Sequence, residues 1–399
     1  MSCVSASVIK SARVIVAFLL LLSAACATTP GPAPEPAPQE PGQPPTPPTA
    51  VPAPSTPPRD KSALRINIVS VGDMMIGTDY PANHLPDDDG VSFLSGVAPV
   101  ISAADIAFGN LEGVLMDGGE PVKQCSNPEA CYLFRSPTRY AKHYGDAGFD
   151  VLSLANNHAR DFGEEGRSSS MEALSAIGIE HSGREGTSAV LKHGDISVLV
   201  LAYAVTKNSN MMLDYVTAFE QIAASADKYD IVIVSFHGGA EGADVTHIPF
   251  AEEEYYGEPR GDVVGFARGA VDAGADLVIG HGPHVVRGME RYKDRLIAYS
   301  LGNFATYYGI SVAGIKGVAP ILSATLDGDG VFIAGEITST VQLRPAGPSI
   351  DKNQRALNLI RGLSVDDFGE SGLRFLPDGK LLPAERAAVK PHELVITTH

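Results

Sequence analysis

Between residues 64 and 300, short runs of almost entirely apolar residues alternate with longer segments whose apolar residues recur at helical spacing. Strands this apolar need cover on both faces, and a layered α/β fold provides it by placing helices outside the sheets. The strand candidates are residues 64–71, 104–108, 150–154, 196–202, 231–236, 276–279 and 295–300, and the helix candidates are residues 138–147, 164–177, 215–226 and 260–273. The alternation predicts an α/β fold.

Residues that can bind a metal follow five of these strands directly. Ligand sites in α/β sheets lie beyond the carboxyl ends of the strands, so residues far apart in the sequence can meet there. Each cluster alone has a structural alternative, because Asp after Gly is commonly a turn or cap and a strand-end His can be hydrogen-bonded without a metal. The clusters are Gly72-Asp73, Gly109-Asn110-Leu111-Glu112, Asn156-Asn157-His158, His237-Gly238-Gly239 and Gly280-His281-Gly282-Pro283-His284. Together they predict one shared metal site.

The types of ligand restrict the metal. Imidazole, carboxylate and amide groups without thiolate favour Mn, Fe or Zn in open coordination, whereas Mg rarely recruits so many histidines. Two such ions, about 3.5–4 Å apart, can clamp a phosphoryl group and lower the pKa of a bridging water to near 7. We therefore expect one or two divalent transition-metal ions and a site suited to hydrolysis of phosphate esters.

The motifs also resemble those of a known family. The segments GDMM, GNLE, NNH, a strand-end His, GHGPH and the later Tyr299-Ser-Leu-Gly-Asn-Phe304 occur in the order of the CapA family of capsule and poly-γ-glutamate synthesis proteins. That family is similar to the calcineurin-like metallophosphatases, and the resemblance runs from about residue 66 to about residue 369. It implies a four-layer α/β/β/α sandwich with a metal centre between its two sheets.

The resemblance implies a role for each matching residue. His158 would be a catalytic residue that does not bind the metal and that either protonates the leaving oxygen or stabilises the charge of the transition state. Asn110 and Asn303 would contact the metal ligands without binding the metal themselves. The implied metal ligands are Asp73, Glu112 as the bridging carboxylate, Asn157, His237, His281 and His284.

The chain departs from the wider metallophosphatase pattern in three motifs. That superfamily begins with Asp-x-His, whereas Asp73 is followed by Met74 and Met75. Its Gly-Asp-x-x-Asp is replaced by the segment ending at Glu112, and its Gly-His-x-His by the segment ending at His284. The first metal position therefore lacks one ligand, which favours a single-metal or weakly held site.

The N-terminal residues predict export. Positive residues precede an apolar run at residues 14–22, and small residues then lead to Cys26, as in a secretory signal peptide of residues 1–25. Cys26 resembles the lipidated cysteine of bacterial lipoproteins, although Ser23 stands where that motif prefers Leu. We expect a membrane-anchored lipoprotein that faces the periplasm or the cell surface; simple export and an uncleaved anchor are the alternatives.

A proline-rich segment follows Cys26 and divides the chain. Frequent prolines enforce an extended polyproline II geometry, which makes residues 26–60 a tether that can reach roughly 100 Å at about 3.1 Å per residue. Recognition by a partner domain is the alternative. We expect the CapA-like metallophosphatase domain over residues 61–370 and a C-terminal extension over 371–399, with a helix near 351–362 and a hairpin near 372–383.

Two further features have open interpretations. Cys125 and Cys131 are predicted to form a disulfide because the protein is expected to be exported; a pair of free thiols is the alternative. Glu241 and His247, in the loop after His237, either line the cleft or belong to a solvated loop.

The charge of the chain limits its partners. Its 30 Lys and Arg stand against 47 Asp and Glu, a formal net charge of −17, so we expect no nucleic-acid partner. Two functions remain. One is a metal-dependent hydrolase of the cell envelope acting on a phosphoester or on a bond of an anionic polymer. The other is a non-catalytic, metal-dependent polyanion-binding component of a capsule assembly complex, beside a membrane synthetase.

Overall fold

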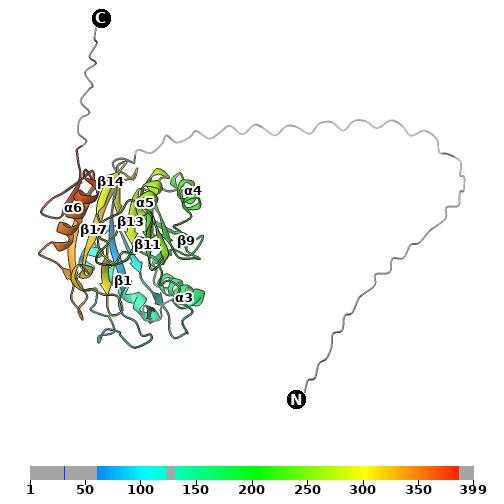
Figure 1. Cartoon of the computed structure of the whole chain (residues 1–399). Helices are drawn as coiled ribbons and strands as arrows, with labels where there is room; N and C mark the ends of the chain where they lie inside the picture. Colours follow the sequence, from blue (N-terminus) through cyan, green and yellow to red (C-terminus); the bar gives the residue numbers. More distant parts are fainter. Residues whose placement is uncertain (1–30, 32–60, 124–130, 386–399) are drawn as a thin grey trace, which may run out of the picture. The chain divides into compact units, whose positions relative to one another are not determined.

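The computed structural model of the chain describes residue 31, residues 61–123 and residues 131–385 (Figure 1). By their contacts, the described residues from 61 onward belong to one compact unit. The expected signal peptide, Cys26 and nearly all of the expected tether lie outside the described residues. In the part of the chain that is described, no helix is both long enough and apolar enough to cross a membrane.

The larger sheet has ten strands and mixes parallel and antiparallel pairs. Its order is β20-β21-β18-β17-β1-β2-β5-β6, with β16 paired to β1 and β19 to β18. The strands are β1 (Arg65–Met75), β2 (Ile106–Leu111), β5 (Val151–Ser153), β6 (Glu180–Ser182), β16 (Asn303–Thr306), β17 (Val318–Asp327), β18 (Phe332–Gln342), β19 (Pro348–Ile350), β20 (Leu373–Phe375) and β21 (Lys380–Pro383).

The second sheet has seven strands in the order β14-β15-β13-β10-β8-β7, with β9 paired to β8. Its centre is parallel, from β8 through β10 and β13 to β15. The strands are β7 (Ala189–His193), β8 (Ile196–Ala204), β9 (Asn210–Met211), β10 (Ile231–His237), β13 (Leu277–His281), β14 (Met289–Tyr292) and β15 (Arg295–Ala298). Two small ribbons, β3 (Val114–Leu115) with β4 (Arg135–Ser136) and β11 (Glu253–Tyr255) with β12 (Glu258–Gly261), lie outside both sheets.

The sheets pack face to face because their strands are apolar on both sides. In β1, Ile66 and Ile68 enter the cluster shared by the two sheets, while Val69 and Val71 face the opposite way. In β10, alternate residues divide in the same manner between the shared cluster and an outer one. Successive side chains of a strand point to opposite faces, so each strand contributes to two hydrophobic layers. Each large side chain buried there stabilises the fold by roughly 1.5–3 kcal/mol.

Helices cover the outer faces and complete four layers. The ten-stranded sheet packs against helices on its outer face, and α4 and α5 cover the other sheet (Figure 1). Asp214 and Asp262 cap α4 and α5 with side-chain oxygens that accept from backbone N–H groups. The helices are α1 (Ala98–Ile101), α2 (Ala141–Ala147), α3 (Gly163–Ser175), α4 (Tyr215–Ala226), α5 (Val263–Asp272) and α6 (Arg355–Phe368), with 3-10 turns at Thr138–Tyr140 and Gly314–Gly317. The predicted α/β/β/α sandwich is thereby confirmed.

An aspartate at the start of a strand recurs in both sheets. Asp105, Asp150, Asp230 and Asp276 each accept a hydrogen bond, 2.8 Å long, from a backbone N–H of the strand beside them. The neighbouring strands are thus joined at their amino ends, which aligns them. Two of these aspartates follow a helix that ends at glycine, which accounts for the DAGFDV and DAGADL segments of the sequence.

The C-terminal part closes one edge of the sandwich. Leu357 and Ile360 of α6 pack into the cluster between the sheets. α6 begins at Arg355, four residues later than predicted. Asp351 lies in the preceding turn, where its side chain accepts a hydrogen bond from the backbone N–H of Arg355. Of the residues expected as an extension after 370, Leu373–Phe375 and Lys380–Pro383 form the hairpin β20-β21, which pairs with β18 and so widens the larger sheet.

Candidate metal centre

Parallel pairing brings the predicted ligands to one place. Asp73 at the end of β1 is in register with Asn110 of β2 and with Asn303 of β16. In the other sheet, His237 of β10 is in register with His281 of β13. All of these side chains are buried. Because the two sheets face each other, the acidic residues of one meet the histidines of the other.

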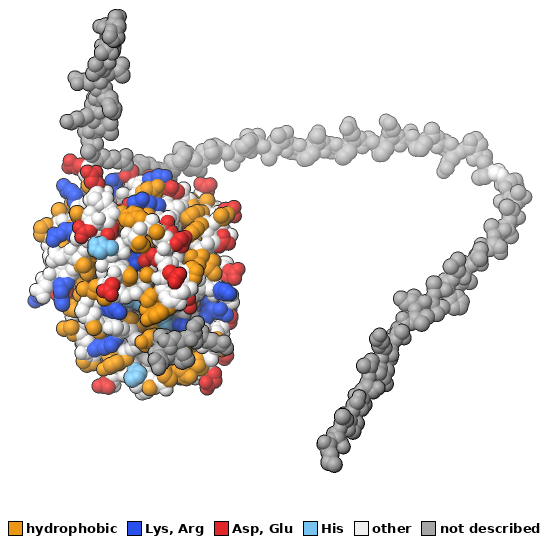
Figure 2. Space-filling view, viewed as in Figure 1, with side chains coloured by type: hydrophobic (Ala, Val, Ile, Leu, Met, Phe, Trp, Pro, Cys, Tyr) orange, Lys and Arg blue, Asp and Glu red, His pale blue; other side chains and the backbone are white. Residues whose placement is uncertain are grey.

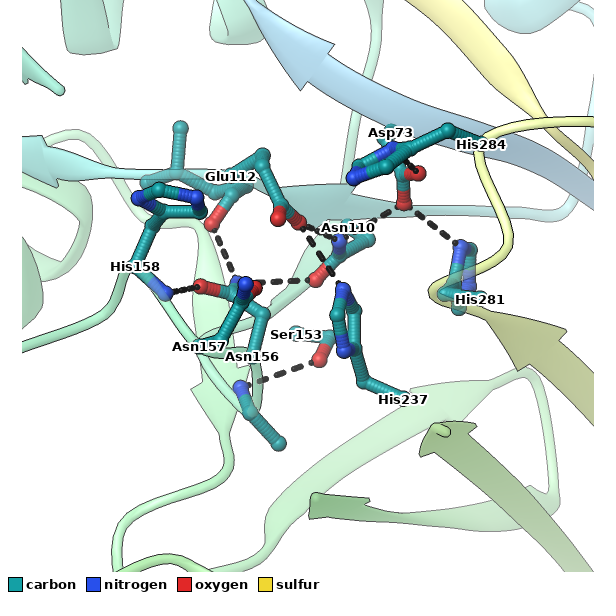
Figure 3. A network of polar contacts seen from close by, with 12 residues as sticks. Asp73, Asn110, Glu112, Ser153, Asn156, Asn157, His158, His237, His281 and His284 are labelled. Atoms are coloured by element: carbon teal, nitrogen blue, oxygen red, sulfur yellow. Dashed lines mark hydrogen bonds and ion pairs between the residues drawn. The ribbon is translucent and has the colours of Figure 1, made fainter. Parts of the chain in front are cut away.

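The contacts between the sheets are short. His237 Nε2 lies 3.3 Å from Glu112 Oε2, His281 Nδ1 lies 3.3 Å from Asp73 Oδ1, and His284 Nδ1 lies 3.0 Å from Asp73 Oδ2. One ligand atom from each of Asp73, Glu112 and His237 falls within 4.8 Å of the others. Figure 3 shows these side chains pointing toward a common centre. Two donors on one ion, each roughly 2.0–2.2 Å from it, fit such separations.

The buried atoms at this centre also lack partners. Glu112 Oε1, Asn157 Oδ1 and both ring nitrogens of His237 and His281 make no hydrogen bond although they are inaccessible to water. An unsatisfied buried polar atom costs about 1–3 kcal/mol, so natural proteins seldom retain several together without a ligand. The donors are imidazole, carboxylate and amide, as a divalent transition metal requires. The residues present therefore fit a metal.

Two glycines of the motifs let the ligands reach this position. A Cβ on Gly72 would lie 1.9 Å from the carbonyl oxygen of Gly302, and one on Gly280 would lie 2.1 Å from that of Tyr299. Any side chain at either position would push the neighbouring backbone away. The close approach sets the positions of the residues that follow, Asp73 and His281.

The asparagines hold the acidic ligands in place. Asn110 Nδ2 donates to Asp73 Oδ1 at 2.9 Å and to Glu112 Oε2 at 2.6 Å. Its Oδ1 accepts from Asn156 Nδ2 at 3.0 Å, which determines which way the Asn110 amide points. Asn303 Oδ1 lies 2.9 Å from His284 Nδ1. Asn110 and Asn303 thus form hydrogen bonds to the predicted ligands and help to fix their positions.

Burial and neighbouring charges set the ionisation of the centre. Burial opposes ionisation of Asp73, but the neighbouring rings of His281 and His284 hold its pKa well below the usual range. Burial also acts against Glu112, yet the charge of His237 brings its pKa down to about 2. Burial would lower the pKa of His284, but the hydrogen bond and charge of Asp73 raise it to about 9. At pH 7 the metal-free centre has both carboxylates ionised and His284 protonated.

His158 lies beside the centre in a network of its own. Its Nδ1 is 2.8 Å from Asp161 Oδ2, and its ring packs on Phe134 with centroids 4.2 Å apart. Lys123 Nζ lies 3.1 Å from Asp161 Oδ1 and 3.3 Å from His158 Nδ1. Figure 3 places the His158 ring next to Glu112. A carboxylate that accepts from Nδ1 leaves Nε2 as the atom that can exchange a proton with a bound molecule.

Sequence reasoning missed Asp161 and Lys123. Asp161 is three residues after His158, and this spacing is a sequence signal for a paired histidine and carboxylate. Lys123 offered none, because it comes from a loop far from His158 in the sequence. Of the two residues with open interpretations, His247 bonds to Asp367 Oδ1 of α6 at 2.7 Å rather than to the centre. Cys131 is disulfide-bonded, and its predicted partner Cys125 lies outside the described residues.

Comparison with known proteins gives one family match. The model of a family described as bacterial capsule synthesis protein PGA_cap matches residues 67–308. The capsule biosynthesis protein CapA of Bacillus anthracis is 26% identical over 279 residues, which cover 62% of this chain and 61% of that protein. The PGA biosynthesis protein CapA of Bacillus subtilis (strain 168) is 28% identical over 254 residues, 59% of this chain and 61% of that protein. The chain thus spans about three fifths of the length of these relatives.

Among solved structures, the purple acid phosphatase PPD1 from yellow lupin seeds is similar in part. It is 11% identical, with a TM-score of 0.36 over 76% of this chain and 56% of that one.

Proposed function

This chain belongs to the PGA_cap family of bacterial capsule synthesis proteins, and from that premise we propose that it is a metal-dependent hydrolase of an anionic envelope polymer. The bond it cleaves is a phosphoester or a bond within the polymer itself. One observation carries the proposal. Ligand atoms of Asp73, Glu112 and His237 converge in the buried centre, where Glu112 Oε1 and both ring nitrogens of His237 have no hydrogen-bond partner, beside a histidine that an aspartate orients.

Asp73, Glu112, His237, His281 and Asn157 would hold a divalent transition metal. When bound, such an ion supplies Lewis acidity and lowers the pKa of a coordinated water to near 7. Asn110 keeps the two carboxylates aligned through its paired donations, so the ligands need no rearrangement on binding. This pre-ordered arrangement supports a catalytic role, because a site that must hold geometry in the transition state gains from rigid ligands.

His158 would provide the proton for the leaving oxygen. Asp161 accepts from His158 Nδ1, and Lys123 and the backbone N–H of Phe134 in turn bond to Asp161. The carboxylate is therefore fixed from three directions and keeps the ring in one tautomer. A positioned imidazole of this kind contributes about 10²–10⁴-fold to a hydrolytic rate.

The charge distribution bears on the substrate. Acidic and basic side chains are interspersed over the face seen in Figure 2, and the chain as a whole carries −17. A polyanion is repelled by such a surface except where a cation is held. A metal at the strand ends would supply that attraction and direct the polymer to the site.

We also propose that the protein is exported and tethered to a membrane through Cys26. The support is the apolar run with small residues before Cys26 and the proline-rich segment after it. A tether of this kind would keep the domain near a membrane synthetase.

A second candidate function is metal-dependent binding of polymer carboxylates without turnover. It is favoured by the names of both CapA relatives, which describe biosynthesis rather than hydrolysis. The same metal ligands would support this binding function, but it would not explain why His158 is oriented by Asp161.

One experiment separates the two. The purified protein is loaded with Mn, Fe or Zn, its metal content is measured, and it is assayed on aryl phosphate monoesters and diesters and on poly-γ-glutamate. We expect stoichiometric metal and hydrolysis, with His158→Ala keeping the metal and losing about 10²–10⁴-fold in rate. Full metal content with no hydrolysis of any of these substrates would favour the binding function. A protein that binds no metal would contradict both.

A further inference from the structure

The residues after Asp73 leave the first metal position short of a ligand. Met74 and Met75 are buried in apolar clusters, Met75 against Phe134 and Ile310, so neither side chain is free to turn toward the centre. The position expected for a third donor is therefore filled by packing. A different part of the chain must provide that donor if a second ion is to be held.

Glu241 lies where such a donor is needed. It is in the loop after β10, and its Oε2 atom is 3.8 Å from His284 Nε2. Its other oxygen, Oε1, is 3.1 Å from Arg260 Nη1, and Arg260 also donates through Nε to the carbonyl oxygen of Gly239 at 2.8 Å. Arg260 is buried, so it holds both the loop and one oxygen of the carboxylate in place. The free oxygen is the one that faces His284.

The hydrogen bonds of His284 leave Nε2 available. Its Nδ1 lies within 3.0 Å of two acceptors, Asp73 Oδ2 and Asn303 Oδ1. The Asn303 amide is oriented by its Nδ2, which donates to the carbonyl oxygens of His284, Ser311 and Lys316. Nδ1 therefore carries a proton and donates it. A histidine that donates one ring N–H to a carboxylate and presents its other nitrogen is the usual arrangement of a metal ligand.

Two donor atoms thus face each other across a gap. At 3.8 Å, His284 Nε2 and Glu241 Oε2 are too far apart for a hydrogen bond, yet their distance suits two ligands each roughly 2.0–2.2 Å from one ion. Both side chains are only slightly exposed, about 14–15% each, so the gap is largely shielded from water. We propose that Glu241 and His284 bind a second divalent cation, next to the ion expected among Asp73, Glu112 and His237.

This inference deepens the proposed function and rests on it. His284 connects the two positions, because its Nδ1 contacts Asp73 while its Nε2 faces Glu241. A second cation at the more open position would attract the phosphate or carboxylate groups of a polyanionic substrate. It would also replace the ligand that Met75 does not provide.

The test is a count of bound ions in the full chain purified in detergent. Metal-free protein is titrated with Mn²⁺ by equilibrium dialysis, and bound metal is measured by elemental analysis. We expect two ions for the wild type, and for Glu241→Gln one ion that remains tight and one weakened by at least about tenfold. His284→Gln should lose the same ion. The matched control is Glu254→Gln, which removes the same charge from an exposed residue of the nearby strand β11 and should bind like the wild type.

The outcomes separate this inference from the proposed function. If Glu241→Gln binds both ions as tightly as the wild type, Glu241 is not a ligand, and if the wild type binds only one ion, the second position does not exist; either result overturns this inference and leaves the proposed function standing. If the wild type binds no ion, both fall. Retention of the tight ion by Glu241→Gln shows that the variant is folded, so a lost ion cannot be ascribed to unfolding.

Discussion

Asp161 Oδ2 lies 2.8 Å from His158 Nδ1, and both side chains are buried beside the predicted metal ligands. The pair sits in the turn that begins α3, where the backbone N–H of Asp161 also donates to the carbonyl oxygen of His158. The loop therefore fixes the two residues relative to each other. This rigidity is what a proton-donating histidine needs, because its ring must be aimed before the substrate arrives.

Replacing Asp161 by Asn should reduce hydrolysis while leaving metal binding intact. The neutral amide no longer neutralises Lys123, and it can offer His158 an N–H donor where an acceptor is required. We expect a loss in kcat of up to about 10²–10⁴-fold, comparable with His158→Ala. Metal content and melting temperature, measured on the same samples, serve as controls. Wild-type kcat in Asp161→Asn would show that the pair has no part in catalysis.

Replacing Asn110 by Ala should weaken metal binding although Asn110 is not expected to bind the metal. Its Nδ2 donates to both Asp73 and Glu112. Without it, two adjacent carboxylates repel each other and lose their alignment. We expect metal affinity to fall about 10–100-fold, as measured by dialysis against a chelator of known affinity. Asn353→Ala, in an exposed turn, is the control; equal affinities in both variants would contradict the role assigned to Asn110.

The strand ends could be predicted from the sequence because parallel strands repeat a simple pattern. An apolar run that stops at a polar cluster indicates both the strand and its carboxyl end, and Asp73, His237 and His281 follow from that alone. The structure brings them together because parallel pairing aligns neighbouring ends. The register of Asp73 with Asn110 and of His237 with His281 is the physical reason.

Contacts between distant loops could not be predicted in this way. Lys123 reaches Asp161 from another loop, and no periodic pattern specifies that meeting. No strand was predicted over residues 303–342, although β17 and β18 form the middle of the larger sheet. Pro320 lies inside β17, where proline argues against a central strand. It is tolerated because β17 pairs with β1 only from Ile321 onward, so Pro320 lies outside that pairing.

The contribution of Asp276 to stability should fall as the pH rises through the range in which its side chain ionises. Burial raises the pKa of Asp276 to about 6, from a value near 3.8 in the unfolded chain. The folded state therefore binds the extra proton between these values, so the contribution of Asp276 to the free energy of unfolding decreases from about pH 4 to about pH 6 and then levels.

Asp276→Asn removes this titration and keeps an oxygen for the backbone N–H of Val232. Relative to the wild type, the variant should gain roughly 1–3 kcal/mol between pH 4 and pH 7. Urea unfolding at both pH values measures the change. Asp378→Asn, at an exposed residue of the turn between β20 and β21, is the control. A difference between wild type and Asp276→Asn that does not vary with pH would contradict the prediction.

Cys26 should carry a lipid. Cells expressing the protein should incorporate labelled palmitate into it, and Cys26→Ser should abolish the label and release the protein from the membrane fraction. Two results would contradict this. A released wild-type protein whose N-terminus has been cleaved near residue 26 would indicate simple export. An unlabelled protein that stays in the membrane with residues 1–25 attached would indicate an uncleaved anchor.

Metal binding at His284 should strengthen steeply with pH. The hydrogen bond and charge of Asp73 outweigh burial and raise the pKa of His284 to about 9, so a proton must leave before a cation can bind to its ring. The affinity of the ion that depends on His284 should therefore rise nearly tenfold per unit from pH 6 to pH 8 and level off above pH 9. Titration calorimetry in two buffers of different ionisation enthalpy should detect about one proton released per ion. The tight ion that remains in His284→Gln should show a shallower dependence, because Asp73 and Glu112 are already ionised throughout this range. Equal slopes in the wild type and in His284→Gln would mean that His284 does not exchange its proton for metal.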